Sequence, residues 1–290
     1  MKITVKTPAT SANLGSAFDV CGIAFKLYNK LSFEKSDELG FDGCEERYAN
    51  DKNLAYLAYK SVLDELGEKG EAKITFKKIG VPLMRGLGSS AALLAAGAYA
   101  ANALYGKKLS DRDLLRICTK LEGHPDNVAP ALFGGMCASV CNEEKVFCHK
   151  SEVSDKIKFT ALIPDFKVST KEARRVLPAL VPFKDATFNS ARCALLSEAF
   201  RSGDFDLIAE VTKDKLHQNY RKALFKNSEE IEKIAYEAGA KAFIVSGAGP
   251  THLAISDKEI ANELNARISS KENGWKAIAL EADNVGTKEI

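Results

Sequence analysis

The sequence has no excess of charge of either sign. Its 290 residues include 41 lysines and arginines against 39 aspartates and glutamates, a formal net charge of +2. This balance argues against a polyanion-binding tail and a polybasic surface, so we expect no nucleic-acid partner and no membrane partner. Hydrophobic residues make up 46% and charged residues 28%, which excludes disorder, collagen and coiled coil. A chain of this length suggests two domains of roughly 150 residues each.

The sequence also lacks a long hydrophobic run. The longest uncharged stretch covers residues 86–106, and its apolar part, residues 91–105, is mostly alanine. That part is shorter than the roughly 20 residues that span a bilayer. The first residues contain no apolar run of signal-peptide length. We therefore expect a cytoplasmic protein in which residues 89–105 form a buried helix.

The seven cysteines form no disulfide framework, because their spacings are scattered along a long chain. Free thiols in a reducing compartment fit this pattern better. Cys137, Cys141, Cys148 and His149 are the candidate zinc ligands, but they lack the short paired loops of zinc ribbons. Cys137 and Cys141 are four residues apart in an expected strand, hence on one face, where cysteine serves as a small core residue.

Hydrophobic periodicity predicts a mixture of strands and helices. We expect an edge strand over residues 2–7, a turn-rich loop over 8–15 and a strand over 18–33. Apolar residues at helical spacing predict a helix over 51–66, closed by Gly67. Ser110 is the expected N-cap of another helix, which a loop at residues 123–127 and then a short helix follow. Polar residues 151–156 mark the expected boundary to an α+β second half.

The most distinctive local pattern is the glycine loop of residues 82–92. Gly86 and Gly88 allow positive φ angles and close approach of a ligand. Ser89 and Ser90 stand where a helix begins, and free N–H groups at a helix start favour phosphate. The simpler alternative is an N-capping serine. The loop has no Walker A lysine, and its likeness to a dinucleotide fingerprint lacks the preceding buried strand.

Two further segments concentrate polar side chains. The stretch EGHPDN at residues 122–127 holds two carboxylates, an imidazole and an amide in an expected loop, which favours function over a solvated turn. Glu122 is the expected ligand of a hard divalent cation. Arg174 and Arg221 are either surface charges or a pair that holds a carboxylate. Arg221 ends a polar stretch that also contains His217.

Several segments in a fixed order carry a family resemblance. They are PATSANLG at residues 8–15 with Phe18-Asp19, GLGSSAA at 86–92, EGHPDNVAP at 122–130, TKEAR at 170–174 and SGAGPT at 246–251. Together they resemble the GHMP kinase superfamily (galacto-, homoserine, mevalonate and phosphomevalonate kinases), and within it the homoserine kinase family. The Pro-Gly pair that usually precedes Phe-Asp in that family is replaced here by Ser16-Ala17.

The resemblance implies an α+β fold of two domains, residues 1–153 and 154–290. The first resembles ribosomal protein S5, with a left-handed βαβ crossover, and the second a ferredoxin-like sandwich. It also implies transfer of phosphate from ATP to L-homoserine in threonine biosynthesis, with Mg²⁺ as cofactor, and it allows a homodimer. Another GHMP kinase acting on shikimate or mevalonate, or a non-catalytic sensor, are the alternatives.

The same resemblance implies roles for individual residues. The ATP-binding residues would be Asn53, near the adenine, and Pro82, Leu83, Met84, Arg85, Gly86, Leu87, Gly88, Ser89, Ser90, Ala91 and Ala92. The metal ligands would be Ser90 and Glu122. The substrate-binding residues would be Asn13, Asp19, His124, Arg174, Arg221 and Gly247. The catalytic residues would be Asn127 and Asp126, although Asp126 as a base follows from its chemistry and not from the family.

Overall fold

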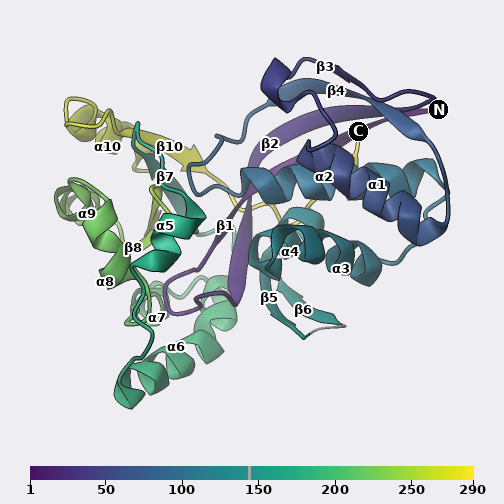
Figure 1. Ribbon diagram of the computed structural model, residues 1–290. Helices are drawn as coiled ribbons and strands as arrows, with labels where there is room; N and C mark the ends of the chain where they lie inside the picture. The colour runs from purple at the N-terminus through teal and green to yellow at the C-terminus, as the bar shows by residue number, and fades with distance from the viewer. Residues whose placement is uncertain (143–144) are drawn as a thin grey trace.

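The computed structural model describes residues 1–142 and 145–290, which two β-sheets organise (Figure 1). The first sheet runs β11-β1-β2-β4-β3, with β5 paired to β2 and β6 to β5. The second runs β10-β7-β9-β8. The strands are β1 (Lys2–Ala12), β2 (Cys21–Ser36), β3 (Gly40–Asp42), β4 (Glu71–Ile79), β5 (Met136–Cys141), β6 (Val146–Ser151), β7 (Lys158–Ile163), β8 (Ala242–Val245), β9 (His252–Ser256), β10 (Lys276–Leu280) and β11 (Lys288–Glu289).

Strand β1 is longer than the sequence predicts, and it is not an edge strand. It pairs with β2 on one side and β11 on the other, and it continues through residues 8–12, which were expected to be a loop. A register shift between Pro8 and Ala9 accommodates the proline, which cannot donate a ladder hydrogen bond. The edge-strand prediction is wrong because β11, from the end of the chain, pairs with β1. The loop prediction is wrong because the small residues 8–12 are buried in the sheet and do not form a turn.

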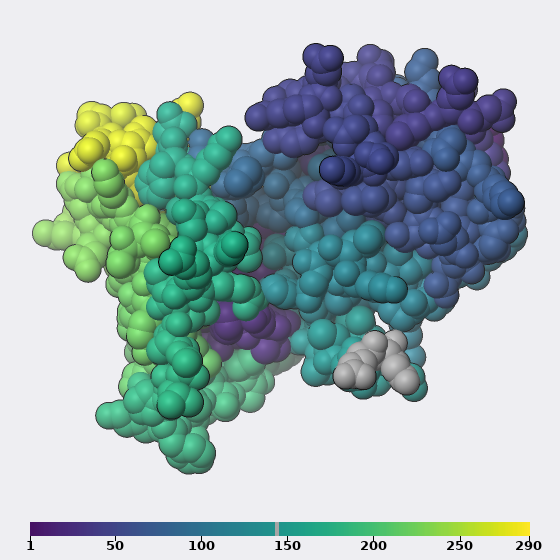
Figure 2. Space-filling view, viewed as in Figure 1, coloured from purple at the N-terminus to yellow at the C-terminus, as the bar shows by residue number. Residues whose placement is uncertain are grey.

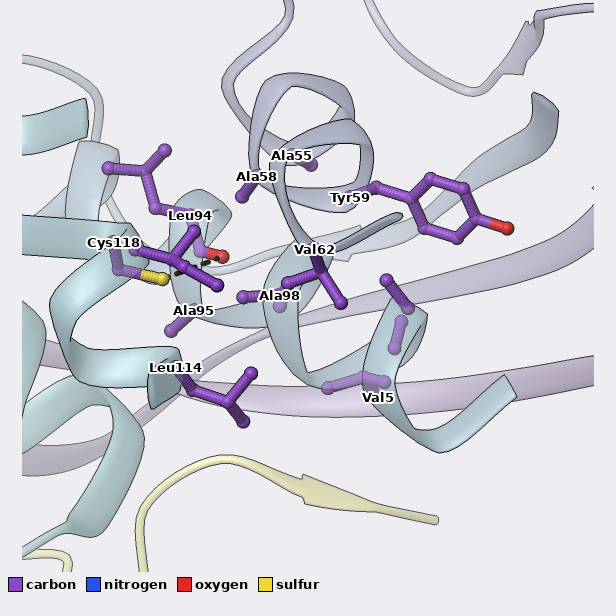
Figure 3. Packing of buried hydrophobic residues seen from close by; sticks show 14 of the residues in the cluster. Val5, Ala55, Ala58, Tyr59, Val62, Leu94, Ala95, Ala98, Leu114 and Cys118 are labelled. Carbon is purple, nitrogen blue, oxygen red and sulfur yellow. Dashed lines mark hydrogen bonds between the residues drawn. The ribbon is translucent and has the colours of Figure 1, made fainter. Parts of the chain in front are cut away.

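Helices α1 (Leu54–Leu66) and α2 (Ser89–Leu104) pack against each other beside the first sheet (Figures 1 and 3). Asn53 caps α1 and Gly67 ends it, close to the predicted bounds. A Cβ on Gly97 would overlap the carbonyl of Ala55, so only glycine lets the two backbones approach this closely. The alanine-rich run is the buried helix that we expected. Among the described residues, no helix is long and apolar enough to cross a membrane.

Helix α3 (Asp111–Glu122) begins at a capping box in which Ser110 and Asp113 bond each other's main chain, as the sequence predicts for Ser110. The polar stretch after it is not the expected loop. Helix α4 (Pro125–Phe133) starts within it, with proline in the first turn. The prediction is wrong because proline, which breaks a helix interior, fits the first helical position, where its missing N–H has no partner to lose.

The second sheet is covered by helices from the second half of the chain (Figure 1). These are α5 (Thr170–Arg175), α6 (Phe183–Ser202), α7 (Phe205–Val211), α8 (Gln218–Arg221), α9 (Ser228–Glu237) and α10 (Ala261–Ile268). Residues 282–290 then return to the first sheet. There β11 pairs with β1, and Thr287 Oγ1 donates to the carbonyl of Ala131 at 2.8 Å.

The candidate zinc-ligand cysteines lie on the paired strands β5 and β6, where the side chains of Cys137 and Cys148 meet. Cys137 is buried, whereas Cys141 lies exposed at the end of the same strand, so the expectation that both serve the core holds only for Cys137. All seven thiols are free. In the part of the chain that the structure describes, the groups placed to share one ion are Asp19, His124 and Asp126, and no cysteine is among them.

Candidate active site

The glycine loop lies between β1 and the turn that joins β8 to β9. Gly86 and Gly88 have φ angles of +77° and +66°. A Cβ on Gly88 would overlap Thr10 Oγ1, and one on Gly86 would overlap the carbonyl of Ser246. Gly88 itself is the N-cap of α2 and offers no side chain, so the simpler alternative of an N-capping serine is wrong. The first N–H groups of α2 therefore have no side-chain cap and can bind an anion.

Ser90 and Glu122 meet beside this helix start. The hydroxyl of Ser90 donates a hydrogen bond to Oε2 of Glu122, which ends α3. Burial raises the pKa of Glu122, and the bond from Ser90 only partly offsets this effect. A carboxylate whose charge is disfavoured by burial gains from a nearby cation. These two oxygen donors fit Mg²⁺, which prefers oxygen ligands.

The polar stretch that begins α4 follows Glu122 directly in sequence and adds His124, Asp126 and Asn127. Asp126 is 4% exposed, and burial raises its pKa to about 6. Ligand atoms of Asp19, His124 and Asp126 lie within 4.8 Å of one another. Asn127 accepts a hydrogen bond of 2.8 Å from Thr10 Oγ1, the same hydroxyl that Gly88 closely approaches. This stretch therefore connects the glycine loop to Asp19.

Asp19 forms an ion pair with Arg174 of α5, across 155 residues of sequence. Both guanidinium Nη atoms of Arg174 donate to the carboxylate, at 3.0 and 2.8 Å. The Nη2 atom also lies 2.9 Å from Nε2 of His124. Each side chain of the Asp19–Arg174 pair is about one-third exposed, at 35% and 36%. The two halves of the chain thus meet through opposite charges that solvent reaches.

Arg221 lies close to Arg174 but deep in the protein, at 1% exposure. Both guanidinium groups lie over the ring of Phe18, at 5.1 Å for Arg221 and 5.6 Å for Arg174. Nη1 of Arg221 donates to the carbonyl of Gly247 at 2.9 Å, which also accepts from Asn13 at 3.1 Å. Burial lowers the pKa of Arg221 to about 10, so it stays charged at neutral pH.

The turn at residues 246–251 connects the antiparallel strands β8 and β9 as a hairpin, and it also joins the two sheets. Ser246 Oγ donates to the carbonyl of Gly86 at 2.6 Å, and it lies at hydrogen-bond distance, 2.8 Å, from Ser11 Oγ. The N–H of Gly247 donates to the carbonyl of Ala12 at 2.9 Å. Figure 2 shows a groove between the two halves, with atoms from the first part of the chain at its floor. The glycine loop and the two arginines are brought together across this join.

Some predicted residues lie apart from this cluster or turn away from it. The side chain of Asn53 bonds Tyr48 and Ala55, and within the described residues no hydrogen bond joins it to the glycine loop. Leu83 and Met84 are exposed, and Arg85 forms an ion pair with the exposed Asp165. The side chains of Leu87, Ala91 and Ala92 are fully buried, so only their main chain is available to a ligand. Pro82 is half-buried.

Other residues of the site were not predicted. Thr10 and Ser246 lie inside segments that the resemblance quotes, so their place in those motifs was the available signal. His217, Asp214 and Asn189 form a buried network behind Arg221, and no local pattern distinguishes them.

Two family models of the GHMP kinases match the chain, one in each half. The model of the GHMP kinases N terminal domain matches residues 53–135, and that of the GHMP kinases C terminal matches residues 196–273. The homoserine kinase of Clostridium beijerinckii is 44% identical, over 98% of this chain and 97% of its own length. That of Clostridium botulinum (strain ATCC 19397) is 42% identical over the same shares. The chain belongs to the homoserine kinase family.

Solved structures agree with this family membership. The crystal structure of homoserine kinase from Cytophaga hutchinsonii matches with a TM-score of 0.89 at 29% identity, covering 100% of this chain and 97% of that one. L. major mevalonate kinase in complex with R-mevalonate matches with a TM-score of 0.72 at 15% identity, covering 95% and 94%, which shows a shared fold. The expected two-domain GHMP kinase fold is confirmed.

Proposed function

We propose that this member of the homoserine kinase family transfers the γ-phosphoryl group of ATP to the side-chain hydroxyl of L-homoserine. The ion pair between Asp19 and Arg174 carries the choice of substrate. A carboxylate and a guanidinium held 2.8 Å apart are complementary to the ammonium and carboxylate of an amino acid. An entering amino acid exchanges this internal pair for two intermolecular ones. Because both groups are partly exposed, separating them costs little.

In this proposal each end of homoserine has its own partners. Arg174 and Arg221 hold the carboxylate next to Gly247, and Asp19 with His124 faces the ammonium. Asn13 and Asn127 lie around the hydroxyl end. Mevalonate and shikimate carry a carboxylate but no ammonium, so either one leaves the charge of Asp19 without a partner.

The triphosphate of ATP belongs at residues 82–92, where the free N–H groups at the start of α2 face it, with Asn53 near the adenine. Mg²⁺ belongs at Ser90 and Glu122, whose oxygens already meet. When bound there, the ion would neutralise negative charge on the triphosphate. The role of the loop is to hold the γ-phosphate in line with the homoserine hydroxyl.

Phosphoryl transfer has a loose transition state, so positioning and charge stabilisation supply most of the catalysis. Asn127 orients the hydroxyl. Asp126 is the candidate acceptor for the hydroxyl proton, because it lies beside Asp19 and its pKa of about 6 leaves it ionised at neutral pH. In its wider setting, the enzyme works in the cytoplasm in threonine biosynthesis, as a monomer or a homodimer, without a nucleic-acid or membrane partner.

The test is ADP release from Mg·ATP by the purified chain with L-homoserine, L-serine, shikimate or mevalonate as acceptor. We expect the highest kcat/KM with L-homoserine, and ³¹P NMR should identify a phosphomonoester product. Faster turnover of shikimate or mevalonate would replace the substrate assignment. Binding of ATP and L-homoserine without any turnover would indicate the sensor instead.

A further inference from the structure

Behind the proposed homoserine site, a buried histidine joins two of the segments that form it. His217 has no exposed surface and comes directly before α8, which carries Arg221 one turn later. Nε2 of His217 lies 2.8 Å from the carbonyl oxygen of Gly15, and Nδ1 lies 3.2 Å from Nη1 of Arg221. The ring therefore spans from the loop before Asp19 to the buried arginine.

Only one tautomer of His217 satisfies both contacts. The carbonyl of Gly15 accepts, so Nε2 must carry the hydrogen, and the guanidinium of Arg221 donates, so Nδ1 must accept. Burial lowers the pKa of His217 to about 4, so the ring is neutral at physiological pH. A neutral ring with Nε2–H matches the donor and acceptor on its two sides.

His217 is itself held rigidly in place. The ring of Phe18 stacks on it, with centroids 5.2 Å apart. The buried carboxylate of Asp214 accepts the main-chain N–H of His217 at 2.9 Å and the side-chain amide of Asn189 at 2.7 Å. Asn189, on α6, also donates to the carbonyl of Ser16 at 3.0 Å. The ring is thus fixed relative to both the loop and α8.

We propose that His217 is a positioning residue for the substrate carboxylate, orienting Arg221 through Nδ1 and anchoring the loop that carries Asp19 through Nε2. The described hydrogen bonds of Arg221 use Nε, to the carbonyl of Ala173, and Nη1, to Gly247 and His217. Losing the acceptor on His217 removes one of the contacts that set the plane of the guanidinium fork. This inference rests on the proposed function, because it needs Arg221 to bind homoserine.

Two substitutions distinguish the role of Nδ1 from the role of Nε2. His217→Asn keeps an acceptor near the position of Nδ1, whereas His217→Gln keeps a donor near Nε2 and loses that acceptor. We expect His217→Gln to raise KM for homoserine about tenfold, the equivalent of about 1.4 kcal/mol, with KM for ATP unchanged. His217→Asn should raise KM for homoserine less, because it loses only the bond to Gly15 that anchors the loop before Asp19. Equal KM values in the two variants, or a fall in kcat with KM unchanged, would overturn the proposal.

His252→Asn is the matched control. His252 is equally buried in the same half of the chain, but its Nε2 bonds Ser228 and not Arg221. It should lower the melting temperature without changing KM for homoserine. A rise in KM in this control as large as that in His217→Gln would show that loss of any buried histidine is enough, and would contradict a specific role for His217.

A measurement on the wild-type chain covers the case in which the His217 variants do not fold. The chain has four histidines, so ¹⁵N-histidine NMR spectra can be assigned. We expect the Nε2–H tautomer of His217, with an Nδ1 signal that moves on addition of homoserine but not of Mg·ATP. A ring protonated on Nδ1, or one insensitive to homoserine, would refute the inference. If wild type shows no homoserine-dependent ADP release, the proposed function has failed instead.

Discussion

Replacing Arg174 by lysine tests the proposed amino-acid site at its partly exposed ion pair with Asp19. Arg174 reaches Asp19 through two nitrogens and His124 through one of them. Lysine keeps the charge but cannot reproduce the fork. Losing one charge-assisted hydrogen bond costs about 1.5–3 kcal/mol, which predicts a rise of about 10- to 150-fold in KM for homoserine. Because the pair is about one-third exposed, the free energy of unfolding should change by less than about 1 kcal/mol.

The assay compares KM for homoserine with KM for ATP in coupled ADP release, alongside thermal melts. Arg175→Lys is the matched control, because Arg175 is the next residue of the same short helix and is exposed. We expect the control to match wild type in both KM values. The reasoning is refuted if Arg174→Lys leaves KM for homoserine unchanged, or raises KM for ATP by the same factor. Non-additivity with Arg221→Lys would show that both forks hold one carboxylate.

Three further changes test the metal ligands and the buried carboxylate. Glu122→Gln should abolish most turnover with the melting temperature preserved; near-normal kcat at ordinary Mg²⁺ contradicts its role as ligand. Ser90→Ala should raise the Mg²⁺ requirement without the stability loss of a cap, since Gly88 is the N-cap. The folded Asp126 binds its proton more tightly than the unfolded carboxyl, so wild type gains stability as pH falls through about 6. Asp126→Asn should therefore melt higher than wild type at about pH 8, and this difference should shrink by about pH 5; a constant difference contradicts the raised pKa.

Local signals in the sequence predicted the helices best. The helix α1 follows from its apolar spacing and from Gly67, which act within a few residues, whereas its cap at Asn53 emerged only from the structure. The same signals misled at residues 8–12, where small residues usual in turns form the buried part of β1, and at Pro125, which begins a helix. Motif residues such as Glu122 could be named because chemistry restricts which side chains bind cations.

Long-range contacts were beyond the reach of any local pattern. The sequence offered Arg174 and Arg221 as a possible pair, but only the fold brings both over the ring of Phe18. It also gave no sign that the carboxylate of Asp19 would accept two hydrogen bonds from the guanidinium of Arg174, since 155 residues separate them. His217 was one polar residue among several until the structure placed Gly15 and Arg221 on its two sides.

The pairing of β11 with β1 affects how the chain folds during synthesis. The N–H of Ile290 donates to the carbonyl of Thr4, and Thr287 bonds Ala131. These partners emerge from the ribosome long before residues 287–290, so the first sheet keeps an open edge while the whole second sheet is being made. An open strand edge can pair with another chain. Ribosome stalling after β10 is therefore expected to leave the β1 edge of the first-made half open to aggregation.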